Sequence, residues 1–294
     1  VDAKKAVHKA RNTIASAINA KSDEVIFTSG ATESDNIAVL GVAERYEDKG
    51  KHIITCATEH KAVLDPCKEL EERGWGVTYL PLDEYGMVDL EDVQNAIRDD
   101  TTLISIMMAN NEVGTIAPVR EIGAMAREHG VKFHTDAAQC LGHIPIDVDL
   151  LSASAHKCYG PKGIGLLYRR RSRPRVNIKP QIFGGGHERG LRSGTLNVPA
   201  IVGFGKAVEV GLKVMGEENE KYRDWTDRMF EQLQAELGDV ERNGHPTERL
   251  AHNLNVYIPG IESRALIVDL KETAVATGSA CTSADVEPSH VITA

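Results

Sequence analysis

A lysine and an aspartate each follow a short apolar run of the sequence. Lys157 ends the segment Ser154-Ala155-His156-Lys157, and Asp136 directly follows the run VKFHT. A lysine that is desolvated at a strand end has a lowered pKa, and its amine becomes available for a Schiff base. Taken singly, Lys157 also fits an exposed turn lysine, and Asp136 also fits a helix N-cap.

A third candidate is the segment SGAT, residues 29–32, which follows the run VIFT and precedes a helical stretch. Free backbone N–H groups at a helix N-terminus bind anions, so Ala31 and Thr32 are candidates for a phosphate site. An ordinary strand-to-helix turn explains the same segment equally well. The segment matches neither G-x-G-x-x-G nor the phosphate loop of nucleotide hydrolases, which argues against dinucleotide or ATP binding.

In combination these residues indicate a cofactor. A phosphate site, a lysine and an aspartate on neighbouring strand ends meet the needs of pyridoxal phosphate, which are a Schiff-base amine, a phosphate clamp and a carboxylate for the ring nitrogen. His60 is placed to cover the ring, and Gln139 to reach its phenolic oxygen. Taken alone, each of these two side chains is better explained as an ordinary polar residue at a strand end.

Metal binding is the competing interpretation. His52, Cys56 and His60 are spaced by four residues, but the run HIITC has the character of a strand, in which that spacing does not align ligands. A second group is close in sequence: His134, Asp136, Cys140 and His143. The strand geometry favours the organic cofactor, and we expect no metal.

One cysteine differs from the others in its surroundings. The chain has five cysteines, an odd number, and no C-x-x-C pair, so neither a disulfide framework nor a cysteine zinc cluster is indicated. Cys281 lies in TGSACTSA, a loop of small polar residues with little to bury. An exposed thiol of this kind is a candidate nucleophile, whereas Cys56 and Cys140 fit packing positions.

The elements that position these residues alternate along the chain. The expected strands are the runs VIFT, HIITC, GVTYL, LISIMM, VKFHT, LLSAS and IGLLY. The expected helices between them cover residues 34–48, 61–73, 89–98 and 118–129. This alternation predicts an α/β fold with a mainly parallel sheet wrapped by helices, in which ligands bind at the carboxyl ends of the strands. After Asn197 the pattern changes to long charged helices, so we expect a large domain over residues 1–214 and a smaller α+β domain over residues 215–294.

Composition limits the classes of partner. The 294 residues carry a formal net charge of −9, which argues against broad binding to nucleic acid. No stretch approaches the roughly 18 continuous apolar residues of a membrane span, and the first residues lack a signal-peptide pattern. We therefore expect a cytoplasmic protein that binds neither membranes nor nucleic acid directly.

Seven segments together resemble a known family. They are SGATES, TEHKAVLD, NNEVG, HTDAAQ, SAHKCYGPKGIG, GGGHERGLRSGTLN and GSACTSA. In this order they are similar to the cysteine desulfurases, which are pyridoxal-phosphate enzymes of aminotransferase class V and fold type I. The segments GLRSGTLN and GSACTSA resemble the group that serves iron–sulfur cluster assembly and tRNA thiolation.

The resemblance implies roles residue by residue. Lys157 resembles the Schiff-base lysine, Asp136 the partner of the ring nitrogen, and His60 the ring-stacking histidine. Gln139 resembles the phenolate contact. The remaining cofactor contacts implied are Asn111, Ala31, Thr32, Ser154 and His156, the last three as phosphate ligands.

Two further roles concern the partner subunit and the sulfur atom. Thr195 resembles a phosphate contact lent by a second subunit, which implies a homodimer, and Cys281 resembles the nucleophile that accepts sulfur. The implied activity is conversion of L-cysteine to L-alanine with a persulfide on Cys281, which then passes to an iron–sulfur scaffold or a thiolation enzyme. A selenocysteine lyase and a non-catalytic scaffold that binds a sulfur carrier remain the alternatives.

The sequence departs from the family pattern in three places. The family arginine that holds the substrate carboxylate is expected beyond Ala294, and an opening segment is expected before Val1. The stretch at residues 146–149 is several residues shorter than the family pattern.

Overall fold

The computed structural model describes residues 1–141, 148–172, 175–277 and 289–294. Seven apolar runs form the main sheet, as the sequence predicts. The strands are β1 (Val25–Thr28), β2 (His52–Cys56), β3 (Gly76–Leu80), β4 (Thr101–Ser105), β5 (Lys132–Asp136), β6 (Leu150–Ser154) and β7 (Gly165–Arg169). A separate two-stranded ribbon pairs β8 (Glu241–Arg242) with β9 (Val256–Tyr257).

The strand order across the main sheet is β1-β7-β6-β5-β4-β2-β3. Strands β6, β5, β4, β2 and β3 run parallel, and β7 runs antiparallel to both of its neighbours. The prediction of a mainly parallel sheet is thus confirmed. Because β6 and β7 are antiparallel, the segment between them, residues 155–164, stays at the carboxyl end of β6 and does not cross the sheet. This segment carries Lys157.

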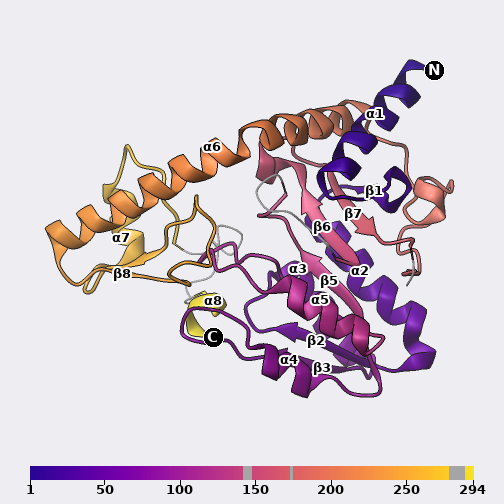
Figure 1. Cartoon of the computed structure of the whole chain (residues 1–294), viewed down its shortest axis with the longest axis horizontal. Helices are drawn as coiled ribbons and strands as arrows, with labels where there is room; N and C mark the ends of the chain where they lie inside the picture. The colour runs from indigo at the N-terminus through magenta and orange to yellow at the C-terminus, as the bar shows by residue number, and fades with distance from the viewer. Residues whose placement is uncertain (142–147, 173–174, 278–288) are drawn as a thin grey trace.

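The helices cover both faces of the sheet (Figure 1). They are α1 (Asp2–Ala17), α2 (Ala31–Tyr46), α3 (Lys61–Glu72), α4 (Leu90–Ala96), α5 (Val119–Glu128), α6 (Val198–Leu237), α7 (Ser263–Asp269) and α8 (His290–Thr293). Helix α2 begins at Ala31, three residues before the predicted start, which brings Thr32 and Glu33 into its first turn. Pro118 is the N-cap of α5, where the sequence predicts a first helical residue.

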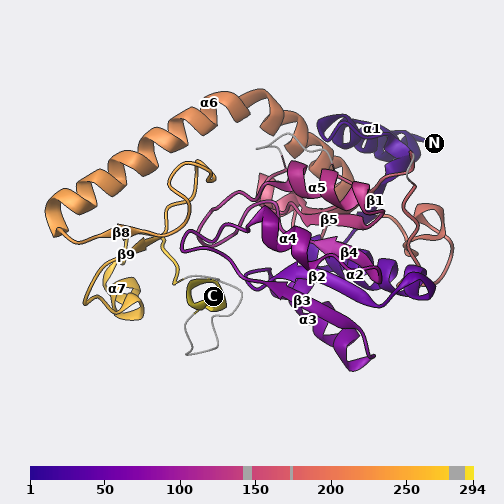
Figure 2. The ribbon, with the colours of Figure 1, turned by 60° about the horizontal axis from the view of Figure 1, so that its bottom comes forward.

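Alternation of side chains along the strands builds two cores. Phe27, Ile54 and Phe133 pack with α1, α5 and α6, whereas the adjoining strand residues Ile26 and Ile53 pack with α2 and α3. Figure 2 shows α1 and α5 on one side of the sheet and α3 on the other. Since successive strand residues point to opposite faces, the continuous apolar runs reflect a sheet buried on both sides.

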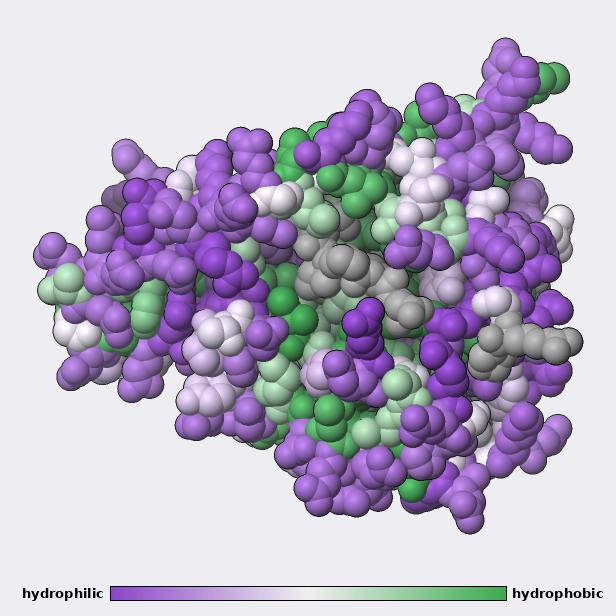
Figure 3. All heavy atoms as spheres, in the orientation of Figure 1, coloured by the Kyte–Doolittle hydropathy of each residue, from purple (hydrophilic) through white to green (hydrophobic). Residues whose placement is uncertain are grey.

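Helix α6 leads away from the sheet. Its buried residues, from Ala200 to Val208, lie in its first part, and the remainder extends toward β8, β9 and α7 (Figure 1). The surface is largely hydrophilic, and Figure 3 shows hydrophobic residues where α6 approaches α1. Val202 and Val210 are partly exposed on α6. No helix of the described residues is long and apolar enough to span a membrane.

A close backbone approach fixes the edge of the sheet beside the start of α2. A Cβ atom at Gly165 would lie 2.5 Å from the Ala153 carbonyl oxygen and 2.6 Å from the Gly30 Cα. Only glycine fits at such a distance. The start of β7, the end of β6 and the turn before α2 are therefore held together.

A buried ion pair ties the first helix to the segment between β7 and α6. Arg11 donates to Glu188 through Nη1 at 2.7 Å and Nη2 at 2.6 Å, and the Phe27 amide donates to the same carboxylate at 2.8 Å. The two charged side chains are 10% and 2% exposed. A second cation, Arg189, donates to the Val25 carbonyl oxygen together with Arg11. The pair joins α1, β1 and the 182–197 segment.

Removal of one partner of this pair is expected to be costly, because the other charge stays buried. We predict that Glu188→Ala lowers the free energy of unfolding in urea by about 3 kcal/mol. The matched control is Arg98→Ala in the exposed Arg98–Asp100 pair, where the expected loss is about 0.5 kcal/mol or less. Equal losses in the two variants would show that the Arg11–Glu188 pair does not hold the fold.

Candidate active site

A hydrogen bond joins the N-terminus of α2 to the end of β6. The Ala31 amide donates to Ser154 Oγ at 2.7 Å. Gly30 caps the helix without a side-chain hydrogen bond, and Thr32, the second residue of the helix, is exposed. Because Ser154 Oγ accepts from Ala31, its own O–H is left to donate to another group. Amide groups and a hydroxyl thus meet at one helix N-terminus, which is an arrangement that suits an anion.

The turn after β6 presents two basic side chains next to this helix start. His156 and Lys157 are exposed within the short 3-10 turn Ala155–Cys158. Burial and the positive charges of Lys157 and Lys162 lower the pKa of His156. The turn ends at Tyr159, which adopts a positive φ of 61°. Lys157 thus follows the carboxyl end of β6, but the structure leaves it exposed and not desolvated as the sequence predicts, because it lies on a short turn at the surface.

Asp136 lies at the carboxyl end of β5, the next strand along the sheet. It is 6% exposed, and its Oδ1 accepts the Ala138 amide at 2.8 Å. Burial raises the pKa of Asp136, while the Ala138 amide and the positive charges of His60 and Lys157 act in the opposite direction. His60 and Lys157 therefore lie close enough to Asp136 to influence its pKa.

The other predicted contacts lie on loops at the same ends of the strands. His60 is the N-cap of α3, and its Nδ1 accepts the Ala62 amide at 3.0 Å, which fixes the ring. Gln139 and Asn111 are half-buried in the loops after β5 and β4. Asn110, which precedes Asn111, is buried, and its Oδ1 accepts two backbone amides of the turn that follows it. Asn110 therefore shapes the loop after β4.

Thr195 and Cys281 complete the set of sequence predictions. Thr195 is exposed on the segment that leads into α6. Cys281 lies outside the described residues, as does part of the short 146–149 stretch. The structure places the other predicted cofactor residues at the strand ends and in the adjoining turns, and the roles of all of them stay predictions.

A buried polar layer lies on the same face of the sheet as Asp136. His134 Nδ1 lies 2.8 Å from Ser105 Oγ, and its Nε2 lies 3.0 Å from Ser152 Oγ. Asp35 of α2 is fully buried, with Oδ1 3.6 Å from His134 Nε2. Burial lowers the pKa of His134 to about 3, so its imidazole is neutral.

Three carboxyl groups are buried in this region, those of Asp35, Glu59 and Asp136. Burial raises the pKa of Asp35 and of Glu59 well above their ordinary values, and the charge on Asp136 adds to both rises. Neither oxygen of Asp35 has a hydrogen-bond partner among the described residues. Asp136, by contrast, has an amide donor and two basic side chains acting on it. Among the three, Asp136 is therefore the carboxyl group whose ionised form has the most favourable neighbours.

The sequence analysis did not assign roles to Asp35 and Glu59. Glu59 is fully buried, and its Oε1 accepts the Met107 amide at 2.6 Å. Asp35 shares a helical spacing with the buried Ala38, Val39 and Val42, at three, four and seven residues along α2. That periodicity is a local signal that Asp35 faces inward. For Glu59 the only signal is its place after β2.

The four described cysteines are all buried. Burial raises the pKa of Cys67 to about 12 and that of Cys158 to about 11, and it raises the pKa of Cys56 and Cys140 well above the ordinary value. Since the thiolate is the nucleophile, none of these four is suited to attack.

Of the side chains considered for metal binding, His143 lies outside the described residues, and His52 and His134 have hydroxyl partners. His52 lies between Thr101 Oγ1 and Thr78 Oγ1, both at 2.8 Å, and it does not approach His60 along the strand. Over the described residues, no group of three or more His, Cys, Asp or Glu side chains is arranged to hold a metal ion.

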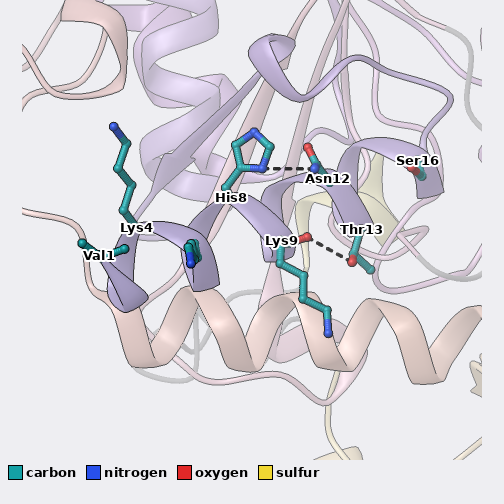
Figure 4. A pocket seen from close by; sticks show the side chains of 8 residues that line it. Val1, Lys4, His8, Lys9, Asn12, Thr13 and Ser16 are labelled. Carbon is teal, nitrogen blue, oxygen red and sulfur yellow. Dashed lines mark hydrogen bonds between the residues drawn. The ribbon is translucent and has the colours of Figure 1, made fainter.

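A hollow of about 730 Å³ lies along the outer face of α1 (Figure 4). Its lining consists of Val1, Lys4, Lys5, His8, Lys9, Asn12, Thr13 and Ser16. None of these residues belongs to the strand-end cluster, and none combines with a buried acid or a nucleophile. The chemistry therefore places the candidate active site at the strand ends.

The donor set at the strand ends fits pyridoxal phosphate. The start of α2 with Ser154 suits the phosphate, Lys157 supplies an amine, and Asp136 supplies a buried carboxylate for a protonated ring nitrogen. Ser154 and Lys157 lie at the end of β6, and Asp136 lies at the end of the adjacent strand β5. The residues present therefore match the group chemically.

Comparisons with known proteins identify a family and relatives for the whole chain. The family model described as Aminotransferase class-V matches residues 1–294. The chain is 50% identical over 297 residues to "Cysteine desulfurase IscS" of Ehrlichia chaffeensis, covering 99% of this chain and 72% of the relative. It is 52% identical over 298 residues to the protein of the same name from Acinetobacter baumannii (strain AYE), covering 99% and 73%. A solved structure described as "SspA in complex with cysteine" is 38% identical, with a TM-score of 0.86, over 99% of this chain and 82% of the other.

The neutral state of His134 predicts a pH dependence of stability. The folded state leaves this imidazole unprotonated down to about pH 3, whereas in the unfolded chain it gains a proton below its ordinary value of 6.5. Protons therefore favour the unfolded state, and stability is lost as pH falls from 6.5 toward 3. We predict that His134→Asn removes a slope of about 1.4 kcal/mol per pH unit from the unfolding free energy in this window.

The measurement is urea unfolding of both proteins at several pH values between 4 and 7. Asp35, whose raised pKa gives the opposite slope, is present in both proteins and cancels in the comparison. Ser105→Ala is the control, because it removes a hydrogen bond to the same ring without removing a titrating group. Parallel pH profiles for wild type and His134→Asn would refute the assignment of a buried neutral imidazole.

Proposed function

The chain belongs to the class-V aminotransferase family, among its cysteine desulfurases, and we propose that the residues at its strand ends carry the removal of sulfur from L-cysteine. The observation that carries this proposal is the convergence of Asp136, Lys157 and His60 beside the Ala31–Ser154 hydrogen bond. No other cluster of the described residues combines an amine, a buried carboxylate and an anion site.

We propose that pyridoxal phosphate is the cofactor of this chain. When bound, it supplies an electron-withdrawing ring that stabilises negative charge developing on the substrate Cα. Ala31, Thr32, Ser154 and His156 would hold its phosphate, and the Lys157 amine would attach it covalently. The Asp136 carboxylate would hold the proton on the ring nitrogen, because the Ala138 amide and the basic groups of His60 and Lys157 favour its ionised form.

The face and the phenolic edge of the cofactor ring would be contacted by different residues. The His60 ring is oriented by the Ala62 amide, and we propose that it covers one face of the cofactor and excludes water there. Gln139 and Asn111, half-buried on adjacent loops, would hold the phenolic edge. The Lys157 amine, once it is exchanged for the amine of the substrate, is placed to move a proton at Cα.

We propose Cys281 as the sulfur acceptor. The sequence has five cysteines, and the four that the structure describes are buried with raised thiol pKa values. The Cys281 thiolate attacks the substrate sulfur, so that an S–S bond forms and the bond between substrate sulfur and Cβ breaks. The Cβ atom keeps the electron pair and takes a proton, which yields L-alanine and a persulfide on Cys281.

Several wider assignments accompany this proposal. Thr195, exposed on its loop, would contact the phosphate of a second subunit in a homodimer. The persulfide would pass to an acceptor protein, either an iron–sulfur scaffold or a thiolation enzyme, and we propose the cytoplasm as the location. We place the domain boundary near Val214, within α6 and after its last buried residue, Val208.

The lysine assignment has a direct chemical test. We predict that full-length protein incubated with pyridoxal phosphate and then reduced with borohydride carries the added cofactor mass on Lys157. Lys157→Ala should carry no such mass and should release no alanine from L-cysteine, because no amine remains to attach the cofactor. The matched control is Lys162→Ala, in the same turn, which should be labelled as wild type is. Label on Lys162 in wild type would reassign the role.

The nucleophile assignment is tested by separating binding from sulfur transfer. Cys281→Ser keeps the size of the side chain but replaces a thiol by a hydroxyl that is protonated near neutral pH. We predict that cofactor binding persists while alanine release from L-cysteine falls by at least about a hundredfold. Mass spectrometry of wild type after cysteine should show one added sulfur on the peptide that contains Cys281, with Cys67→Ala as the control.

The outcomes of the same assay separate the alternatives. Added sulfur on Cys56, Cys67, Cys140 or Cys158 would contradict the nucleophile assignment. Alanine release from selenocysteine but not from cysteine would indicate a selenocysteine lyase. Turnover of neither substrate by the cofactor-loaded protein would indicate a non-catalytic scaffold.

A further inference from the structure

An ion pair joins the start of α2 to the segment that carries Thr195. Arg192 donates to Glu33 through Nε to Oε1 at 2.6 Å and through Nη2 to Oε2 at 3.0 Å. The side chains are 21% and 14% exposed, so solvent screens this forked contact only partly. The two residues are 159 positions apart in the sequence.

Glu33 occupies the anion-binding end of its own helix. It is in the first turn of α2, and its Oε2 also accepts the Ser29 amide at 2.8 Å. Burial would raise the pKa of Glu33, but the hydrogen bonds from Arg192 and Ser29 outweigh burial and lower it. The carboxylate is therefore ionised, one residue after Thr32.

This placement creates an electrostatic conflict at the proposed cofactor site. The start of α2 is also where the phosphate would bind, through the amides near Ala31 and the hydroxyl of Ser154. A carboxylate beside a phosphate in a partly buried site repels it, which weakens binding. The guanidinium of Arg192 cancels the charge of Glu33 at this point, so the phosphate meets a neutral pair.

The segment that supplies Arg192 is itself firmly held. Ser193 is buried, its amide donates to the Ile182 carbonyl oxygen at 3.2 Å, and its Oγ accepts the Gly186 amide. Four residues before Arg192, Glu188 is anchored to Arg11. Arg192 is thus presented to α2 from a fixed backbone.

We propose that Arg192 is a positioning residue for the cofactor phosphate, which it favours by neutralising Glu33 at the start of α2. This inference rests on the proposed function, because it assumes that the phosphate binds at this helix end. Arg192 acts through Glu33, so the effect of Arg192 on phosphate binding depends on the presence of the Glu33 carboxylate. A plain structural tether would instead lose the same contact whichever partner were removed.

The test measures the dissociation constants of pyridoxal phosphate and of pyridoxal, which lacks the phosphate, for the cofactor-free full-length protein. We expect Arg192→Gln to weaken binding of pyridoxal phosphate by about tenfold or more, because Glu33 is left uncompensated, and to leave pyridoxal within about threefold. Glu33→Gln should bind pyridoxal phosphate at least as tightly as wild type. The double variant should recover most of the loss, and Arg192→Lys should keep most of the affinity.

Equal losses in Arg192→Gln and Glu33→Gln, without recovery in the double variant, would overturn the proposal in favour of a tether. Equal losses for pyridoxal and pyridoxal phosphate would overturn it as well. Arg73→Gln, which breaks the pairs of Arg73 with Glu44 on α2 and Glu69 on α3, is the matched control and should leave both constants unchanged. Thermal unfolding of each cofactor-free variant reports whether the protein is folded.

Ser154→Ala separates failure of this proposal from failure of the proposed function. If the phosphate binds at the start of α2, this variant loses affinity for pyridoxal phosphate more than for pyridoxal. An unchanged preference in Ser154→Ala would refute the phosphate site itself, and with it the premise. A loss in Ser154→Ala together with no phosphate-specific loss in Arg192→Gln would refute the role of Arg192 alone.

Discussion

The hydrogen bond from the Ala31 amide to Ser154 Oγ is the contact on which the rest of the site depends. It aligns the N-terminus of α2 with the carboxyl end of β6. The absence of a Cβ atom at Gly165 allows the turn before α2 to approach this end of the sheet closely. Because β6 and β7 are antiparallel, the connection after Ser154 stays at this edge and presents Lys157 beside Asp136 on β5. The anion site, the amine and the acid are thus consequences of how two strands and one helix meet.

At this edge of the sheet, buried acids lie beneath α2 and an ion pair lies at the surface of the same helix. The buried acids Asp35 and Glu59 have strongly raised pKa values, whereas a backbone donor and two basic groups favour the ionised form of Asp136. At the surface of the same helix, Glu33 is ionised, and its charge is cancelled by Arg192. A cofactor with a positive ring nitrogen and a negative phosphate therefore meets a carboxylate at one end and a neutral anion site at the other.

Much of this arrangement could be predicted from local sequence, and the part that could not has a physical reason. Apolar runs and helical spacing indicated all seven strands of the main sheet and the alternation that makes it mainly parallel, although β4 begins two residues before the predicted run. Strand-end positions also indicated Asp136, His60 and Lys157, which the structure brings together. The Arg11–Glu188 and Glu33–Arg192 pairs join residues 177 and 159 positions apart, and no local pattern reports such contacts. The neutral His134 likewise depends on burial between α2 and the sheet, which becomes visible only when the layers are assembled.

The central claim is that one cofactor occupies the strand ends in a single orientation. The most direct measurement is a crystal structure of the full-length protein with pyridoxal phosphate bound. The account predicts density for the phosphate against the start of α2 and Ser154, a covalent bond from the cofactor to Lys157 Nζ, and the ring nitrogen within hydrogen-bond distance of Asp136. Cofactor density along α1, or at the strand ends with the ring nitrogen turned away from Asp136, would contradict it.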